Sequence, residues 1–143
     1  VDLSAIDSTA KHVMGTVAYD NKGRKYVYVK ANGTIALGNF VKAASADDPY
    51  TDVVIATASG AATLVLGMAP QALVAGNYAW IVQTGIFEDD AQVVSASVAA
   101  GDPLIVDANC DGTIATAADI ANYIGVCLVD DTDNTGTVLL QCG

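Results

Sequence analysis

Residues 13–41 read VMGTVAYDNKGRKYVYVKANGTIALGNFV, and this stretch decides the fold class. Val13–Tyr19 and Lys25–Lys30 are rich in β-branched and aromatic residues, and the Asp20-Asn21-Lys22-Gly23 sequence between them is typical of a tight turn. Tyrosine and valine alternate within Lys25–Lys30, so tyrosines would line one face of that strand and valines the other. The stretch therefore predicts a β-hairpin.

Outward from this hairpin, short apolar runs alternate with turn residues along the chain. Turns are expected at Asn32-Gly33 and Gly38-Asn39, one helical turn or a tight crossover at Met68–Ala75, and a solvated acidic loop at Glu88–Asp90. The further predicted strands are Val53–Ala56, Thr63–Leu66, Tyr78–Thr84 (closed by Gly85), Val93–Val98, Leu104–Asp107, Tyr123–Val129 and Thr137–Cys142. One short helix is predicted at Thr116–Tyr123.

This rhythm of short strands predicts an all-β protein, either a compact β-barrel or a β-sandwich. Residues 13–143 are expected to form a single domain, because the length suits one hydrophobic core. Residues 1–12 are polar and are predicted to form an extended N-terminal arm.

The charge of the chain is divided sharply along its length. All six basic residues lie in the first 42 positions, which carry three aspartates and thus a formal charge of +3. Residues 43–143 hold the other thirteen carboxylates and no Lys or Arg, a formal charge of −13. The two parts therefore present opposite potentials to a partner, and such potentials steer encounter and orientation.

Composition excludes several classes of function. The net charge of −10 argues against nucleic acid as the main ligand, because neutralising phosphates requires clustered cations. Residues 53–87 carry no charge, as a membrane span would, but glycine and proline interrupt them, which favours buried β-structure. The N-terminus lacks the layout of a secretory signal. Cys110, Cys127 and Cys142 are odd in number and widely spaced, which predicts reduced, structural thiols.

The sequence contains no recognisable catalytic set. His12 is the single histidine; it stands beside no candidate nucleophile and is expected at the surface. The pairs Asp47-Asp48 and Asp89-Asp90 are adjacent in sequence, and adjacent residues of a strand point to opposite faces, so neither suits a general acid and base. The chain is therefore not expected to be an enzyme, and no cofactor is predicted.

Residues 107–114, DANCDGTI, copy the first half of a calcium loop. Asp107, Asn109 and Asp111 would supply oxygen ligands at alternate positions, and the loop also resembles those of dockerins. The twelfth position, which must supply the closing carboxylate, is Ala118, and Asp119 falls one residue late. A β-turn explains the same residues, and no metal site is predicted.

Two blocks of sequence resemble a known family. Residues 67–85, GMAPQALVAGNYAWIVQTG, combine a small-residue stretch with the pattern Gly-x-Tyr-x-Trp-x-x-Gln-x-Gly. Downstream, the segments AAGDPL (99–104), IGVCL (124–128) and GTVLL (136–140) look like the C-terminal part of the same pattern. These blocks, which span about half the chain, resemble the capsid decoration, or cement, proteins of tailed bacteriophages, and residues 15–31 are similar to segments of the same group.

The resemblance implies an all-β structural protein of the virion without catalytic residues. Such a protein binds the major capsid protein on the outside of the shell, stabilises the shell, and forms a homotrimer at threefold or quasi-threefold positions. It would be assembled in the host cytoplasm, with neither nucleic acid nor membrane as a partner.

Combined with the charge division, the resemblance suggests that residues 1–42 face the shell and the acidic remainder faces solvent. Leu3 and Ile6 would then serve as apolar anchors. The candidates for capsid interaction are Leu3, Ile6, Lys11, Lys22, Arg24, Lys25 and Lys30. Two other functions stay open: a phage tail or baseplate component, and a secreted calcium- or carbohydrate-binding β module that would use residues 107–111.

Overall fold

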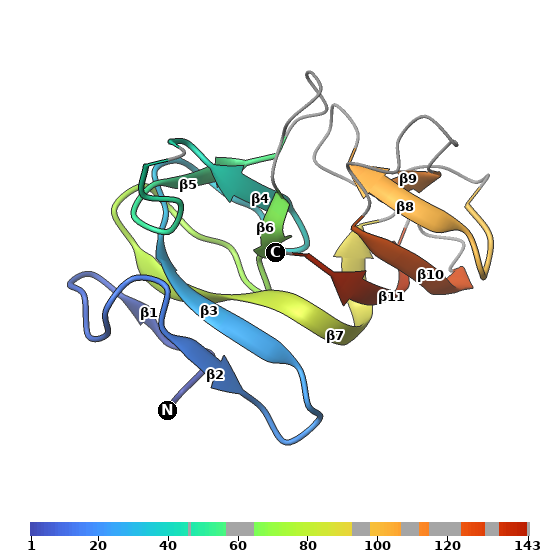
Figure 1. The fold of residues 1–143 in the computed structure, drawn as a ribbon, viewed down its shortest axis with the longest axis horizontal. Coiled ribbons are helices and arrows are strands. Elements are labelled where there is room, and N and C mark those ends of the chain that lie inside the picture. The colour runs from blue at the N-terminus through green and yellow to red at the C-terminus, as the bar shows by residue number, and fades with distance from the viewer. Residues whose placement is uncertain are drawn as a thin grey trace.

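The structure is a computed structural model that describes residues 1–45, 47–56, 65–92, 98–106, 112–114, 124–130 and 135–142. Within these residues the chain forms eleven strands in one sheet and no helix (Figure 1), so the predicted all-β fold class is confirmed. The strands are β1 (Ile6–Asp7), β2 (Val17–Tyr19), β3 (Lys25–Lys30), β4 (Phe40–Ala43), β5 (Val53–Ile55), β6 (Val65–Met68), β7 (Tyr78–Gln92), β8 (Pro103–Val106), β9 (Gly112–Ile114), β10 (Gly125–Asp130) and β11 (Thr135–Gln141).

The predicted hairpin forms as β2 and β3, which pair antiparallel across a turn containing Gly23 with φ of 78°. Tyr26 and Tyr28 are buried in one hydrophobic cluster, while Val27 and Val29 are buried in another. Both faces of β3 are buried. The alternation of tyrosine and valine therefore reflects two separate hydrophobic cores rather than one solvent-exposed and one buried face.

Five strands close into a ring, which is a small barrel. β5 pairs with β4, β4 with β6, β6 with β7 and β7 with β3, and a parallel bridge between Ala31 and Val53 joins the end of β3 back to β5. The aliphatic cluster inside it consists of Val27, Val29, Ala31, Ile35, Val41, Val53, Leu66, Ala69, Leu73, Ala79 and Ile81. Side chains fill a barrel of this size completely, so the ring holds β3 and β7 as a rigid platform.

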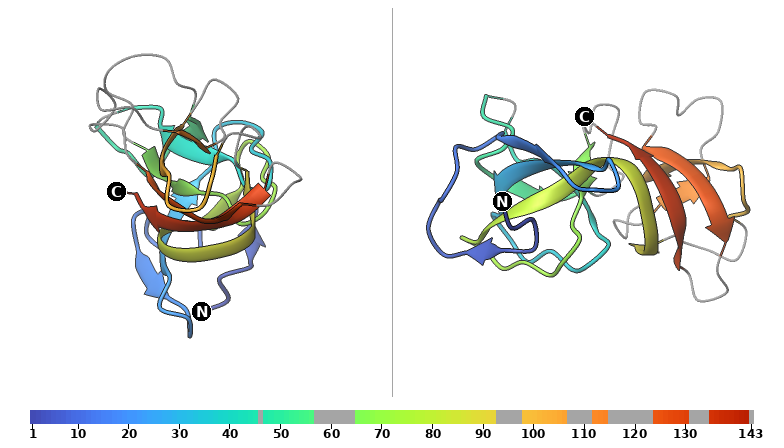
Figure 2. Two further views of the ribbon diagram at one scale, coloured as in Figure 1. Left: turned by 90° about the vertical axis from the view of Figure 1, so that its right-hand side faces the viewer. Right: turned by 90° about the horizontal axis from the view of Figure 1, so that it is seen from below.

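β7 is the strand that links the two halves of the molecule (Figure 2). It is fifteen residues long and pairs with β3 along its first part and with β11 along its second. A register shift at Gln83 marks a bulge, after which Phe87 joins the same core as Trp80. The prediction that Gly85 ends this strand and that Glu88–Asp90 form a loop is wrong, because β11 supplies main-chain partners and the strand continues.

The second half of the molecule contains β8, β9, β10 and β11 beside the far end of β7 (Figure 1). Its buried residues Leu104, Ile124, Val138 and Leu140 belong to the same hydrophobic cluster as Trp80. This first cluster therefore runs from the outer face of the ring into the second half and holds the two halves together.

Most of the remaining predicted strands occur with shifted ends, as β5, β6, β8, β10 and β11. The sequence pattern predicts no strand at β4, which pairs with β5 and β6, or at β9, which pairs with β8. Met68–Ala75 contains no helical turn; an isolated bridge between Ile35 and Leu73 holds it instead. Gly38 takes the turn conformation with φ of 81°, whereas no positive φ occurs at Gly33.

Two predicted elements fall largely outside the described residues. They are the helix at Thr116–Tyr123 and the strand at Val93–Val98, of which Val98 is described as buried and not in a strand. Among the residues that are described, no helix is long and apolar enough to cross a membrane.

Candidate functional site

The N-terminal segment, residues 1–12, lies along the sheet. In β1, Ile6 pairs with Ala79 of β7. The carboxylate of Asp7 accepts a hydrogen bond from the Tyr28 hydroxyl at 2.9 Å and pairs with the Lys11 ammonium at 3.2 Å. The main-chain N–H of Lys11 donates to the same hydroxyl at 3.3 Å. The segment is thus fastened to the outer face of the ring by polar contacts that reach a buried tyrosine.

An aromatic cluster lies beneath this segment. The His12 ring centroid is 5.0 Å from that of Tyr28 and 5.2 Å from that of Trp80, and the Tyr78 ring stacks on Tyr28 at 6.4 Å. His12 is therefore half-buried against aromatic rings rather than a surface side chain as expected. The cluster was not predicted, although the alternating tyrosines and the Gly-x-Tyr-x-Trp pattern indicate an aromatic face that another segment must bury.

The charges of two N-terminal carboxylates are stabilised by their neighbours. The hydrogen bond from Tyr28 holds the pKa of Asp7 below its ordinary 3.8, and Lys11 acts in the same direction against the effect of burial. Burial acts to raise the pKa of Asp20, but the Arg24 guanidinium and nearby main-chain N–H groups outweigh it, so this pKa also lies below 3.8. Both groups are therefore ionised at neutral pH.

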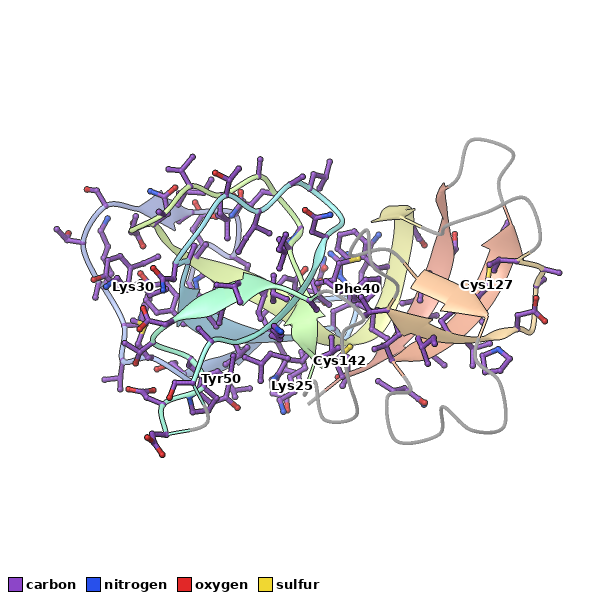
Figure 3. The ribbon with its side chains drawn as sticks, turned by 90° about the horizontal axis from the view of Figure 1, so that it is seen from above. Lys25, Lys30, Phe40, Tyr50, Cys127 and Cys142 are labelled. Carbon is purple, nitrogen blue, oxygen red and sulfur yellow. The ribbon has the colours of Figure 1, made fainter. Side chains whose placement is uncertain are left out.

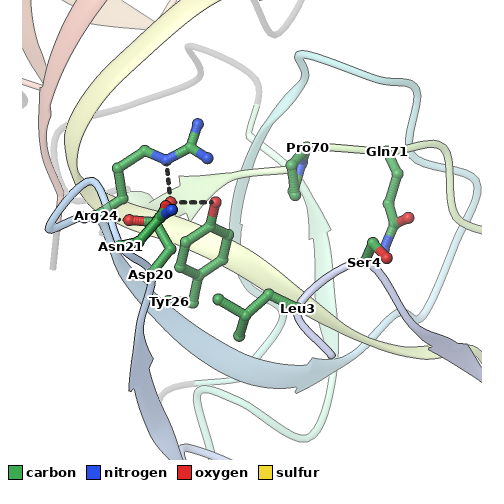
Figure 4. A pocket seen from close by; sticks show the side chains of 8 residues that line it. All are labelled: Leu3, Ser4, Asp20, Asn21, Arg24, Tyr26, Pro70 and Gln71. Atoms are coloured by element: carbon green, nitrogen blue, oxygen red, sulfur yellow. Dashed lines mark hydrogen bonds and ion pairs between the residues drawn. The ribbon is translucent and has the colours of Figure 1, made fainter. Parts of the chain in front are cut away.

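A cleft of about 280 Å³ opens between the N-terminal segment, the β2–β3 turn and the residues that follow β6 (Figure 4). Within it the Arg24 Nε donates to the Asp20 carboxylate at 2.5 Å, and the guanidinium lies 5.7 Å from the Tyr26 ring centroid. The residues that line the cleft are Leu3, Ser4, Asp20, Asn21, Arg24, Tyr26, Pro70 and Gln71.

Three of the predicted capsid-interaction cations are paired with carboxylates of the same chain. Lys11 pairs with Asp7, Arg24 with Asp20, and Lys22 with Glu88 at 3.4 Å. Each pairing reduces the field that the cation presents to a partner. The positive potential of the N-terminal part is therefore weaker than the sequence alone suggests.

The other predicted residues are spread over the surface. Lys25 and Lys30 stand at opposite ends of β3 (Figure 3) and, because the strand alternates, on opposite faces of the sheet. Neither makes an ion pair with a described residue. Leu3 packs against the first core cluster and lines the cleft together with Arg24, whereas Ile6 is 45% exposed. The structure thus brings Leu3 and Arg24 together and keeps the two β3 lysines apart.

The possible calcium ligands Asp107, Asn109 and Asp111 lie outside the described residues, as does Cys110. In the part of the chain that is described, no three His, Cys, Asp or Glu side chains gather as a metal site would require. Cys127 and Cys142 are both buried, and burial raises the pKa of the Cys142 thiol to about 12; that these thiols are reduced stays a prediction. Among the described residues, the N-terminal cleft with the segment packed beside it is therefore taken as the candidate site.

No protein-family model matches the chain, and no curated protein sequence matches it. Among solved structures, the N base of the head fibre protein gp8.5 of bacteriophage phi29 is similar, with a TM-score of 0.57 and 10% sequence identity. The matched region covers 80% of this chain and 92% of that one. At this level of identity the likeness shows the fold alone, because one fold can serve unrelated functions. The chain therefore shares its fold with the base of a phage head fibre.

Proposed function

We propose that this chain is a structural protein of a phage virion that binds the outside of the capsid shell and stabilises it, as a capsid decoration (cement) protein. The observation that carries the proposal is the likeness in fold to a head fibre base over 80% of the chain. The Gly-x-Tyr-x-Trp and Ala-Gly-Asp-Pro-Leu blocks support it from the sequence, without reference to the fold.

The proposed partner is the major capsid protein, and the proposed assembly is a homotrimer at threefold or quasi-threefold positions on the capsid exterior. A closed interface of identical subunits would cover apolar side chains such as Ile86, Leu128 and Val129, which are 38–51% exposed in the single chain. Sedimentation equilibrium tests this part, with a mass of three chains expected and a stable monomer contradicting it.

The N-terminal part is proposed to face the shell and the acidic remainder to face solvent. Lys11 and Lys22 keep exposed side chains despite their ion pairs, and Ile6 of β1 is 45% exposed. Lys25 and Lys30 form no ion pair with any described residue, so no described carboxylate offsets their charges toward a partner. Rim charges of this kind govern association rate and salt dependence more than affinity.

Purified shells of the phage that encodes the chain provide the test. A Lys22→Ala, Arg24→Ala, Lys25→Ala, Lys30→Ala variant should bind shells more weakly than the wild type at low salt, and the difference should shrink as salt rises. Lys42→Ala, a cation outside the proposed contact set, is the matched control. Equal binding of wild type and quadruple variant across the salt series would contradict the orientation, and absence of wild-type binding would contradict the function.

A further inference from the structure

A row of apolar side chains crosses one face of the second half of the sheet. Ile86 of β7 pairs with Leu139 of β11, Leu139 pairs with Val126 of β10, and Val126 pairs with Pro103 of β8. Directly paired residues point to the same face, so these four side chains form one continuous surface, the apolar row. Ile86 is 48% exposed, Pro103 is exposed, and Val126 and Leu139 are half-buried.

The opposite face of the same strands already forms a core. Phe87, Val138 and Cys127 alternate with residues of the apolar row and are buried in the first hydrophobic cluster. An antiparallel sheet with one face in water normally alternates apolar with polar residues, whereas both faces are apolar in this part of the sheet. The apolar row is therefore a surface that a partner is expected to cover.

The charges around the apolar row limit what can cover it. Glu88 lies two positions from Ile86 along β7, and Asp102 directly precedes Pro103, so a carboxylate stands near each end of the row. The chain contains no Lys or Arg after residue 42. The apolar row of a second copy would bring further carboxylates against these, which like-charge repulsion disfavours. The complementary surface must instead be apolar and carry cations.

The β2–β3 hairpin of the same chain is such a surface. β2 pairs with no described strand other than β3, and the hairpin lies at the margin of the molecule (Figure 1). Val17 and Tyr19 are 44% and 66% exposed, and Tyr19 is the direct cross-strand partner of Lys25, which makes no ion pair with a described residue. Lys22 at its turn pairs with Glu88 of its own chain, but both side chains are exposed and such a pair contributes little.

We propose that the β2–β3 hairpin of one copy packs on the apolar row of the next copy. The inference rests on the proposed homotrimer and adds the two surfaces that meet in it. Each contact in a threefold ring joins two different surfaces, as this pair does. Tyr19 and Val17 then lie over the apolar row, and Lys25 approaches one of its acidic ends. Lys30, on the opposite face of β3, stays outside the contact.

Sedimentation equilibrium of two variants tests the contact. Ile86→Asp places a charge in the apolar row and Tyr19→Asp places one on the hairpin, both at exposed positions. Each should raise the concentration at which the trimer dissociates at least about tenfold, the loss expected at a central interface residue. Val74→Asp changes an apolar residue that is 58% exposed and belongs to neither surface, so it should assemble like the wild type. Thermal unfolding verifies that each variant folds.

A photo-crosslinking amino acid at Tyr19 identifies the neighbouring surface directly. It should produce covalent dimers and trimers of the chain, in which peptide mapping places the links on peptides that contain Ile86 or Leu139. Wild-type assembly by both variants, or links to other peptides, would overturn the contact and leave the proposed function standing if the wild type binds shells. A wild type that stays monomeric would overturn both the contact and the proposed homotrimer. Trimers linked as expected that fail to bind shells would support the contact and contradict the proposed function.

Discussion

Removing residues 1–12 should expose Trp80, because these residues cover the aromatic cluster on the outer face of the ring. Trp80 is 1% exposed and Tyr28 is fully buried in the intact chain. Trp80 is also the single tryptophan, so its fluorescence reports this face alone. A red shift of the emission maximum and stronger quenching by acrylamide are therefore expected for the truncated protein.

The loss of stability can be worked from the contacts. His12 packs against two aromatic rings, and each such pair contributes about 0.5–1.5 kcal/mol. Leu3 is half-buried against the first core cluster and adds about 1 kcal/mol of apolar burial. The truncation should thus cost roughly 2–4 kcal/mol, which lowers Tm by about 4–16 °C for a domain of this length.

Point variants distinguish the loss of packing on Trp80 from a general loss of stability. His12→Ala should reproduce part of the red shift and of the loss in Tm, since it removes both ring contacts. The adjacent Val13 is 80% exposed, so Val13→Ala should leave both quantities unchanged. The reasoning is refuted if the truncated protein keeps the wild-type emission maximum and a Tm within about 2 °C of the wild type. Residues 1–12 would then be an arm that adds nothing to the fold.

Three further predictions concern the rest of the chain. Because the pKa of Asp20 lies below its ordinary 3.8 in the folded state, its stabilising contribution is present above about pH 4 and is lost as pH falls through the folded-state pKa; Asp20→Asn should flatten the fall of Tm with pH below about pH 4, and an unchanged profile would contradict this. Cys142 is buried with its pKa raised to about 12, so maleimide at pH 8 should not modify it until the protein is denatured, as peptide mapping would reveal. A Cβ at Gly125 would collide with the Leu139 carbonyl oxygen, so Gly125→Ala should cost several kcal/mol or prevent folding, whereas Gly33→Ala, which meets no atom within 4 Å, should fold normally.

The fold class and the first hairpin could be predicted because they depend on local pattern. Alternation in Lys25–Lys30 and the turn at Gly23 are properties of neighbouring residues, and both occur in the structure. The bulge at Gln83 could not be predicted, because it depends on β3 and β11 pairing with β7 from opposite sides. The pattern placed a loop at Glu88, but pairing with a distant strand keeps that residue extended.

The candidate site, like the fold, could be predicted from the sequence only in part. Leu3 and Arg24 could be named from the sequence as candidate contact residues, since an apolar residue in a polar segment and a cluster of cations are visible there; their contact with a partner stays a prediction. Their common cleft could not, because the N-terminal segment, the β2–β3 turn and the residues after β6 meet through pairing across the sheet. Gln71 carries no signal in the sequence; only the fold places it in the wall of this cleft.

The sequence by itself determined that this chain builds β-strands and that its cations gather near one end. Local propensity and composition decide both, and neither depends on which strands meet. Tertiary structure alone decided what those charges do. It paired Lys11, Lys22 and Arg24 with Asp7, Glu88 and Asp20, and it set Lys25 and Lys30 on opposite faces of one strand. Charge acts through distance in space, and the fold sets that distance.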